Sequence, residues 1–203
     1  LDLASGSSAA YLILRDLGWN IGKWVACEID SETRIVAQGV NPTNTPTRCH
    51  DILELAKMDL RGEYDLVLSA TPCKGFSGIN NKAKGMNGKD GELIRAAAKI
   101  IEKVRARNPQ VKILMENVVL NDNLKDQRGE MNELIGITFK GIKASDQGAS
   151  QQRERMVATN ITDIDMLEKK DAIDPNLLLG RMAEAKHRMT PCLMAAGSAT
   201  KAT

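Results

Sequence analysis

The chain has 203 residues, of which 42% are hydrophobic and 27% are charged, and this composition excludes a disordered chain and a collagen-like one. The net charge of +2 neither requires nor forbids a polyanionic partner, while 3% aromatic residues are too few for a row of base-stacking rings. No apolar run approaches the ~20 residues of a membrane span, and the N-terminus lacks a signal-peptide pattern. We therefore expect an intracellular protein, in the cytoplasm or nucleoid of a prokaryotic or phage system or in a eukaryotic nucleus.

The cysteines and histidines do not form a metal-binding pattern. No two cysteines have CxxC spacing, and the two histidines are far apart in the sequence. We expect no metal, and we expect reduced thiols because the chain carries no secretion signal. The residues concerned are Cys27, Cys49, Cys73, Cys192, His50 and His187.

Short apolar runs alternate with longer segments of helical period. This alternation is typical of an α/β fold, in which a mostly parallel sheet carries helices on both faces. The expected strands are Leu1–Leu3, Trp24–Ile29, Tyr64–Ala70, Lys112–Glu116, Thr138–Ala144 and Met156–Asn160, with a further strand before Asp51. The expected helices are Ala9–Leu17, Ser31–Gln38, Glu92–Arg107 and Asp126–Ile135. In such folds ligands bind at the carboxyl ends of the strands, so residues directly after a strand are candidates for function.

Both ends of the chain have the character of a fragment. There is no initiator Met, and Leu1–Leu3 reads as the close of a strand that should begin earlier. After residue 160 the hydrophobic pattern weakens and the last residues are small and polar. We expect one domain over residues 1–160, followed by a separate and incomplete region over residues 161–203.

A turn of small residues, Ala-Ser-Gly-Ser-Ser at positions 4–8, follows the first strand and would let a ligand approach the backbone. Glu28 lies 22 residues beyond Gly6, close to the ~20-residue offset at which an acidic side chain binds a ribose in nucleotide-binding α/β folds. Alone, Glu28 would be read as a loop charge; with the turn, it indicates an adenosine-containing cofactor. Asp51 fits two roles that can coexist, as an N-cap of the segment starting at Ile52 and as an acceptor for an exocyclic amine.

The segment after the expected strand Tyr64–Ala70 has the features of a nucleophile. Cys73 follows Pro72 at the carboxyl end of the strand and precedes Lys74, so its thiolate would be stabilised and within reach of a substrate. The loop onward to Gly91 is rich in glycine and lysine, which suits a lid over a polyanion. The alternative is a solvated loop without a role.

Two more polar groups follow later strands. Glu116 and Asn117 stand at the end of the expected strand Lys112–Glu116, and a protonated glutamic acid there would donate a hydrogen bond to a ring nitrogen. Arg153 and Arg155 precede the last strand, where guanidinium groups can anchor phosphates or a base carbonyl. An isolated pair of arginines would usually be surface charge, but the order of these groups along the chain favours a site.

The motifs, in chain order, are Pro72-Cys73 with Phe76-Ser77, then Glu116-Asn117-Val118, then Gln151 with Arg153 and Arg155. In this order and at these strand ends, they resemble the motifs of the cytosine-C5 DNA methyltransferases. Several stretches are most similar to the branch that contains the animal de novo methyltransferases. The resemblance covers Leu1 to about Asn160 well and the remainder faintly.

The resemblance implies a Rossmann-like fold that transfers a methyl group from S-adenosyl-L-methionine to C5 of cytosine in DNA, through a bond between Cys73 and C6 of a flipped base. The implied catalytic residues are Cys73, Glu116, Asn117, Arg153 and Arg155. The implied cofactor residues are Leu3, Ser5, Gly6, Glu28, Ile29, Asp51, Ile52 and Pro72. The implied substrate residues are Lys74, Phe76, Ser77 and Gln151.

The resemblance also implies that residues 161–203 begin a target-recognition region, and that the C-terminal motif of the family is missing. The expected partners are double-stranded DNA and, for the missing elements, a second chain. Two alternatives stay open. One is a tRNA cytosine-C5 methyltransferase, which shares the motifs. The other is a catalytically silent scaffold for nucleic acid or a protein, which the missing end and the Ala4-Ser5 departure in the cofactor turn would favour.

Overall fold

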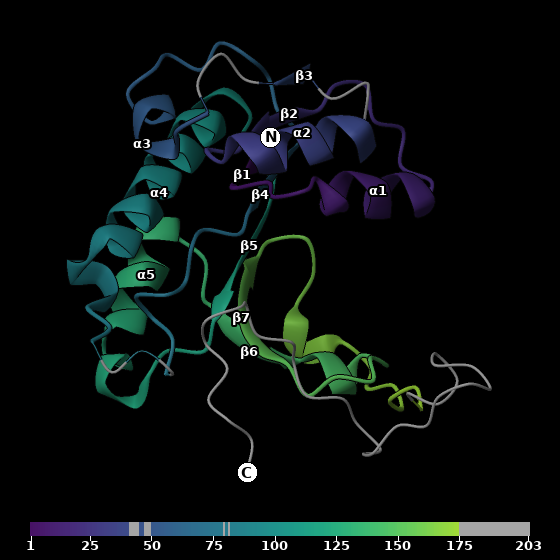
Figure 1. Cartoon of the computed structure of the whole chain (residues 1–203), viewed down its shortest axis with the longest axis vertical. Coiled ribbons are helices and arrows are strands. Elements are labelled where there is room, and N and C mark those ends of the chain that lie inside the picture. The colour runs from purple at the N-terminus through teal and green to yellow at the C-terminus, as the bar shows by residue number, and fades with distance from the viewer. Residues whose placement is uncertain (41–44, 47–49, 79, 81, 175–203) are drawn as a thin grey trace.

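The short apolar runs form the strands of one seven-stranded sheet, in the order β3-β2-β1-β4-β5-β7-β6. The computed structural model describes residues 1–40, 45–46, 50–78, 80 and 82–174 (Figure 1). The strands are β1 (Asp2–Leu3), β2 (Val25–Cys27), β3 (Thr45–Pro46), β4 (Leu66–Ser69), β5 (Lys112–Val118), β6 (Lys140–Lys143) and β7 (Glu154–Thr159).

The strand order reverses direction between β1 and β4. The chain moves outward from β1 to β2 and β3, then returns to pair β4 with the other side of β1 and continues outward through β5. These pairings are all parallel, and only β7 runs antiparallel to its neighbours β5 and β6. In open α/β sheets, ligands bind outside the carboxyl ends of the strands at such a reversal. The topology therefore marks the turns that follow β1 and β4.

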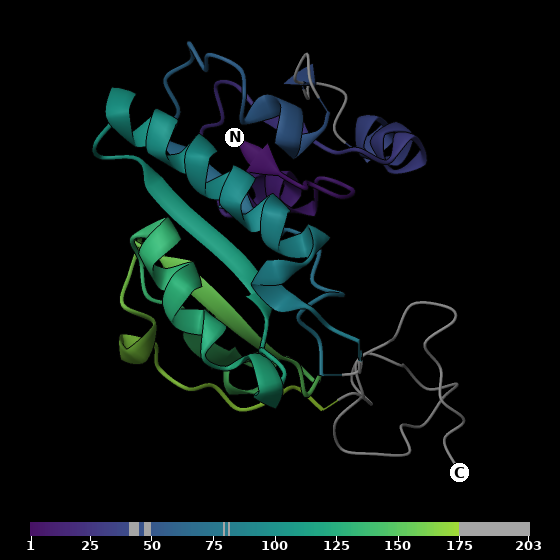
Figure 2. The ribbon, with the colours of Figure 1, turned by 90° about the vertical axis from the view of Figure 1, so that its left-hand side faces the viewer.

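Helices cover both faces of the sheet, as the sequence predicted. They are α1 (Ala9–Asp16), α2 (Ser31–Val40), α3 (Ile52–Leu55), α4 (Lys89–Arg107) and α5 (Gln127–Ile135), with short 3-10 segments η1 (Gly85–Asn87), η2 (Asp122–Leu124), η3 (Ala144–Asp146) and η4 (Ile164–Met166). Helices α3, α4 and α5 lie on one side of the sheet, and α1 and α2 lie on the other (Figure 1). A quarter turn brings α4 and α5 in front of the strands (Figure 2).

Alternating residues of the strands face two cores of unequal size. Val67, Ile113 and Met115 belong to the large core under α3, α4 and α5. Leu68, one position after Val67, faces the opposite way with Trp24 in a small cluster packed against α1. The side with α4 therefore carries most of the buried apolar surface.

Several element boundaries differ from the sequence predictions. Strand β5 continues to Val118, so Glu116 and Asn117 both lie within the strand and pair with residues of β7. Helix α4 begins at Lys89 instead of Glu92, because η1 packs directly against its first turn and starts the helix earlier. A Cβ atom at Gly91 would come within 2.2 Å of the Met86 carbonyl oxygen, so this close approach requires glycine.

The domain boundary expected at residue 160 rests on the sequence pattern and stays a prediction. Residues up to 174 are described, and Lys140 of β6 forms ion pairs with Asp163 and Asp165 beyond that boundary. The rest of the expected target-recognition region, residues 175–203, lies outside the described residues, as do Cys49, Cys192 and His187. The strand expected just before Asp51 corresponds to β3, which lies earlier in the chain, at Thr45–Pro46. Residues 47–49, between β3 and His50, lie outside the described residues.

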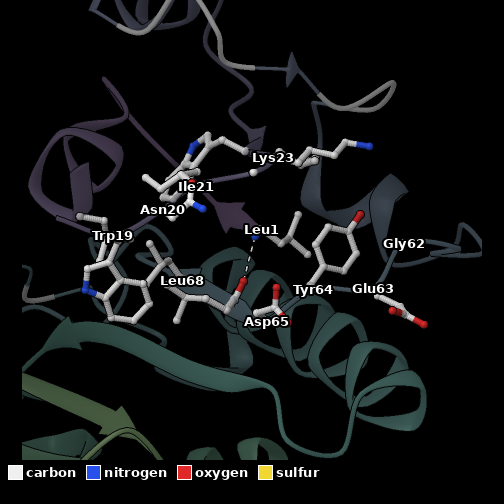
Figure 3. A pocket seen from close by; sticks show the side chains of 15 residues that line it. Leu1, Trp19, Asn20, Ile21, Lys23, Gly62, Glu63, Tyr64, Asp65 and Leu68 are labelled. Atoms are coloured by element: carbon white, nitrogen blue, oxygen red, sulfur yellow. Dashed lines mark hydrogen bonds between the residues drawn. The ribbon is translucent and has the colours of Figure 1, made fainter.

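A pocket of about 350 Å³ lies at the amino ends of β1, β2 and β4 (Figure 3). Trp19 and Tyr64 line it, together with Leu1, whose amino group donates a hydrogen bond to the Leu66 carbonyl oxygen at 2.8 Å. The candidate catalytic residues lie at the opposite edge of the sheet, at the carboxyl ends of β4 and β5 and the amino end of β7. This pocket is therefore at the wrong end of the sheet to be the active site.

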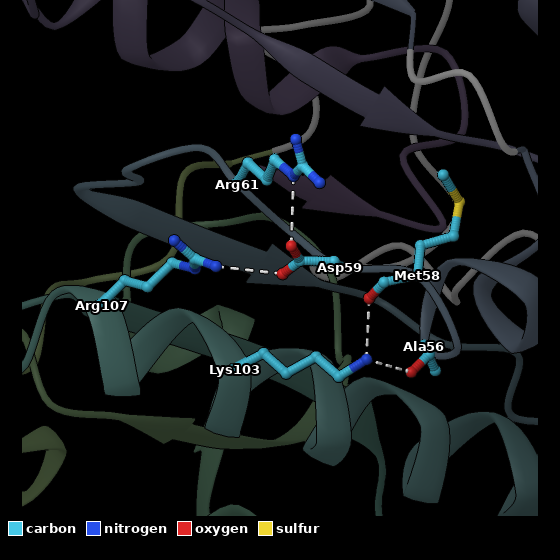
Figure 4. A network of polar contacts seen from close by, with 6 residues as sticks. All are labelled: Ala56, Met58, Asp59, Arg61, Lys103 and Arg107. Atoms are coloured by element: carbon cyan, nitrogen blue, oxygen red, sulfur yellow. Dashed lines mark hydrogen bonds and ion pairs between the residues drawn. The ribbon is translucent and has the colours of Figure 1, made fainter.

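A polar network ties α4 to the segment after α3 (Figure 4). The Lys103 ammonium group donates hydrogen bonds to the carbonyl oxygens of Ala56 and Met58, at 2.7 and 2.8 Å. Nearby, the Asp59 carboxylate pairs with Arg107 at 3.0 Å and with Arg61 at 3.2 Å. Lys103 thus satisfies the carbonyl of Ala56, the C-cap of α3, and that of Met58 in the segment after the helix.

We expect Lys103→Met to destabilise the protein by about 1–3 kcal/mol, because it removes the donor to two backbone carbonyls while keeping most of the apolar stem. Urea unfolding measures the effect. The matched control is Lys99→Met, at an exposed position on the same helix. Equal stability losses in the two variants would show that the capping contacts of Lys103 contribute nothing.

Candidate active site

The turn after β1 is held by the Glu28 carboxylate. The Gly6 N–H donates to one oxygen of Glu28 at 2.9 Å, and the Asp30 N–H donates to the other at 3.0 Å. Ala4 and Gly6 both have left-handed backbone conformations, with φ of 55° and 54°. Strained backbone of this kind at a non-glycine residue is common at ligand sites. Glu28 and Gly6, which are 22 residues apart in the sequence, therefore form one structural unit.

The space beside this turn suits a ligand. A Cβ atom on Gly6 would meet no atom within 4 Å, so the backbone here is open to close approach. A small pocket next to it is lined by Ser5, Glu28, Arg34 and His50. Within the described part of the chain, the buried Ser5 Oγ and His50 Nδ1 atoms have no hydrogen-bond partner.

The other expected cofactor residues surround the same sheet edge. Leu3 is completely buried at the end of β1, and Ile29 is exposed after β2. Asp51 is the N-cap of α3, because its side chain accepts a hydrogen bond from the Leu53 N–H at 2.8 Å, and Ile52 is buried behind it. The N-cap role of Asp51 is thus observed, and its role toward a cofactor stays a prediction.

The cysteine follows β4 in a tight turn. The Cys73 carbonyl oxygen accepts hydrogen bonds from the N–H groups of Phe76 and Ser77, at 3.0 and 3.1 Å. Pro72 and Lys74 are exposed, whereas Cys73 is half-buried between them. The thiol is thus at the surface of the sheet edge but partly shielded from water.

Phe76 is buried beneath the cysteine turn, and its expected role toward a substrate stays a prediction. Its ring is fully buried in the large core, so the side chain anchors the turn. Its carbonyl oxygen accepts from the Asn121 N–H at 3.0 Å, and Ser77 forms a bridge with Leu120. The sequence places Phe76 close to Cys73, but only the packing shows which way its ring points.

The loop that follows is docked along most of its described length. The Gly85 N–H donates to the Gly75 carbonyl oxygen at 2.8 Å, and Met86 is completely buried. The lysines of this loop remain exposed, namely Lys74, Lys82, Lys84 and Lys89. The expected lid is therefore fixed near its C-terminal end, while its cations face solvent.

Asn117 connects β5 to the cysteine turn. Its side chain is fully buried and donates a hydrogen bond to the Thr71 Oγ at 3.4 Å, while its own oxygen accepts from the Val118 N–H at 2.9 Å. Thr71 lies two residues before Cys73. Asn117 thus fixes the base of the turn and does not face solvent.

Antiparallel pairing brings Glu116 and Arg155 together. Their strands β5 and β7 align Val118 with Arg155, and the Arg155 Nε lies 2.8 Å from a Glu116 carboxylate oxygen. Both side chains are mostly buried, so this pair is less screened than a surface ion pair. Arg153 and Gln151 are half-buried in the segment that leads into β7.

Four charged groups act on the cysteine. Burial is the main cause that raises the pKa of the Cys73 thiol above its ordinary value, and the Glu116 carboxylate raises it further. The Arg155 guanidinium opposes this rise in the pKa, Asp90 adds to it, and Arg153 opposes it weakly. The structure therefore brings Cys73, Glu116, Arg153 and Arg155 into one electrostatic site, in which the resting cysteine favours the thiol form.

Three residues near the site were not singled out from the sequence. Thr71 accepts a hydrogen bond from the Asn117 side chain. Asp90 belongs to no recognisable motif, although its carboxylate accepts a hydrogen bond from the cysteine turn. Asp2 is 4% exposed inside β1, and burial raises the pKa of its carboxyl group to about 7, with a smaller increase from Glu28. The sequence could have indicated Asp2, because it is a charged residue between two leucines of an expected buried strand.

Two negative findings apply to the described residues. Among them, no group of three or more His, Cys, Asp or Glu side chains is arranged to hold a metal ion. None of the helices that the structure describes is long and apolar enough to cross a membrane.

The fold and this sheet edge define an α/β protein of the methyltransferase type. A solved structure described as a "putative DNA modification methyltransferase" encoded within a prophage of E. coli matches with a TM-score of 0.58 and 19% identity. The match covers 84% of this chain and 50% of that one, so the chain spans about half the length of this structure. The family model for C-5 cytosine-specific DNA methylases matches residues 1–177. The chain belongs to this family.

We expect Glu116→Gln to lower the pKa of Cys73, because it removes a carboxylate that disfavours the thiolate, and Arg155→Met to raise it. The pH dependence of iodoacetamide alkylation, followed on the Cys73 peptide by mass spectrometry, measures both shifts. Thiolate is the reacting form, so a lower pKa moves the alkylation midpoint to lower pH. The control is Glu133→Gln at an exposed position of α5. Midpoints that do not move in opposite directions would contradict the described electrostatic site.

Proposed function

We propose that this chain is the catalytic part of a DNA cytosine-C5 methyltransferase that uses S-adenosyl-L-methionine. The observation that carries the proposal is the placement of a half-buried cysteine beside the Glu116–Arg155 pair, at the sheet edge next to the Gly6 turn. Membership of the C-5 cytosine-specific DNA methylase family supports both the cytosine substrate and the methyl transfer.

The turn after β1 fits the adenosine part of the cofactor. Glu28 is positioned to accept hydrogen bonds from a ribose, and the open backbone at Gly6 would face the amino-acid part. The buried Ser5 Oγ and His50 Nδ1 atoms offer further polar contacts in the same pocket. When bound, S-adenosyl-L-methionine supplies an electrophilic methyl group on a sulfonium.

The protein residues activate the base. C5 of cytosine is a weak nucleophile, so the Cys73 thiolate first adds to C6, and the electrons of the C5–C6 double bond become available at C5. Glu116 holds a proton at N3 and accepts from the amino group, while Arg155 donates to the base carbonyl. After methyl transfer, a water molecule takes the C5 proton, the C5–C6 double bond forms again, and the Cys73 sulfur is expelled as thiolate.

The ion pair explains how the resting site is held ready for the base. In the structure the Arg155 Nε forms an ion pair with a Glu116 carboxylate oxygen at 2.8 Å. A cytosine inserted between them would exchange this contact for hydrogen bonds to its own ring and carbonyl. The base must leave the helix to enter, and the exposed lysines of the 74–89 loop are suited to the phosphates on either side.

We expect the chain to form a stable covalent adduct with duplex DNA that carries 5-fluorocytosine, in the presence of S-adenosyl-L-methionine, because fluorine cannot leave as a proton does. Denaturing electrophoresis detects the adduct. Cys73→Ser should abolish it and lower methyl transfer by at least about a thousandfold, since covalent catalysis is lost. Adduct formation by the serine variant, or transfer at the wild-type rate, would contradict the proposal.

The nucleic-acid partner is tested in the same assay with an RNA hairpin that carries 5-fluorocytosine. An adduct with RNA but not with DNA would favour the tRNA-methylating alternative. Absence of any adduct, together with absence of cofactor binding, would favour the silent scaffold.

We expect Glu28→Ala to weaken binding of S-adenosyl-L-methionine by about 10- to 100-fold, as it removes a charged acceptor and frees the Gly6 turn. Isothermal titration calorimetry measures the affinity without requiring DNA. Glu32→Ala, an exposed acidic residue in the first turn of α2, is the control. An unchanged dissociation constant for the Glu28 variant would place the cofactor elsewhere.

A further inference from the structure

Asp90, in the first turn of α4, reaches back to the cysteine turn. Its Oδ2 atom accepts a hydrogen bond from the Gly75 N–H at 2.6 Å, and Gly75 lies two residues after Cys73. On the other side of the same residue, the Gly75 carbonyl oxygen accepts from the Gly85 N–H. Both peptide groups of Gly75 are thus held by segments outside the turn.

We propose that Asp90 is a positioning residue for the nucleophile, which fixes the backbone of the Cys73 turn through Gly75 and places a negative charge beside the cysteine. The identity of Cys73 as the nucleophile rests on the proposed function. The contact itself is a property of the fold.

Contacts with neighbouring segments hold the start of α4, and therefore Asp90, in place. Arg95, one and a half turns further along α4, donates to the Met86 carbonyl oxygen at 2.7 Å and pairs with Glu130 of α5 at 2.6 Å. Met86 is completely buried, and its N–H donates to the Gln127 side chain at 2.6 Å. The start of α4 is thereby joined to η1 and α5, so Asp90 is presented from a rigid support.

The charge of Asp90 acts on the cysteine in addition to those of the Glu116–Arg155 pair. Its carboxylate raises the pKa of the Cys73 thiol, in the same direction as Glu116 of β5. The opposing cations are Arg155 of β7 and, more weakly, Arg153 before it. Asp90 would help to keep the cysteine protonated, and therefore resistant to oxidation, until a base binds.

An acidic residue in the first turn also stabilises a helix through the helix dipole, and this alternative must be separated from positioning. Two variants do so. Asp90→Asn keeps an oxygen that can accept from the Gly75 N–H but removes the charge, whereas Asp90→Ala removes both. Glu92→Gln is the matched control, because Glu92 lies in the same first turn and is exposed.

Two measurements on the chain without DNA or cofactor carry the test. Peptide-resolved alkylation against pH reports the Cys73 thiolate, and hydrogen exchange of the peptide containing Gly75 reports the backbone contact. We expect both Asp90 variants to move the alkylation midpoint to lower pH. We expect Asp90→Ala to speed amide exchange at Gly75 about tenfold or more, with Asp90→Asn restoring most of the protection. Glu92→Gln should change neither.

A third measurement links the contact to activity. At a pH where Cys73 is fully ionised, Asp90→Ala should still lower single-turnover methyl transfer by about tenfold, and Asp90→Asn should recover it. Unchanged exchange and an unchanged midpoint in both variants would overturn the proposal, and so would equal shifts in Glu92→Gln. If Asp90→Ala does not fold, Asp90→Asn decides by its midpoint. If the wild type methylates no nucleic acid, the proposed function fails while the alkylation and exchange results still decide the role of Asp90.

Discussion

The parallel pairing of β1 with β4 is the constraint on which the site depends. It aligns Leu3 with Ser69, so the Gly6 turn and the Cys73 turn leave the sheet side by side from the same edge. The two turns come from segments about 65 residues apart, and neither forms a site alone. The strand order reverses at this pair, and in open α/β sheets such a reversal is where ligands bind.

The antiparallel strand β7 completes the site for a simple geometric reason. A seventh parallel strand would bring its carboxyl end to this edge, but β7 brings its amino end. Arg155, near the start of β7, therefore stands beside Glu116, near the end of β5. The fold places the cation and the carboxylate together, and the buried amide of Asn117 locks the same strand to the cysteine turn.

The supports of the site were harder to predict than its chemical groups. Cys73, Glu116 and Arg155 were singled out because reactive side chains at strand ends have few structural reasons to be there. The burial of the Phe76 ring in the core was not predicted, because a motif does not show the direction of a side chain. Asp90 gave no signal, since a carboxylate in a first helical turn is ordinary until its partner, Gly75, is known.

The sequence by itself determined the α/β class, the order of the motifs and the main candidate groups, because hydrophobic period and residue chemistry are local properties of the chain. The tertiary structure decided which groups meet: Glu28 with Gly6, Glu116 with Arg155, and Asp90 with the cysteine turn. It also decided the environment of Cys73, whose pKa is raised first by burial and then by the carboxylates of Glu116 and Asp90 on two other elements. Burial and charge proximity depend on the packing of distant segments, and no local pattern records them.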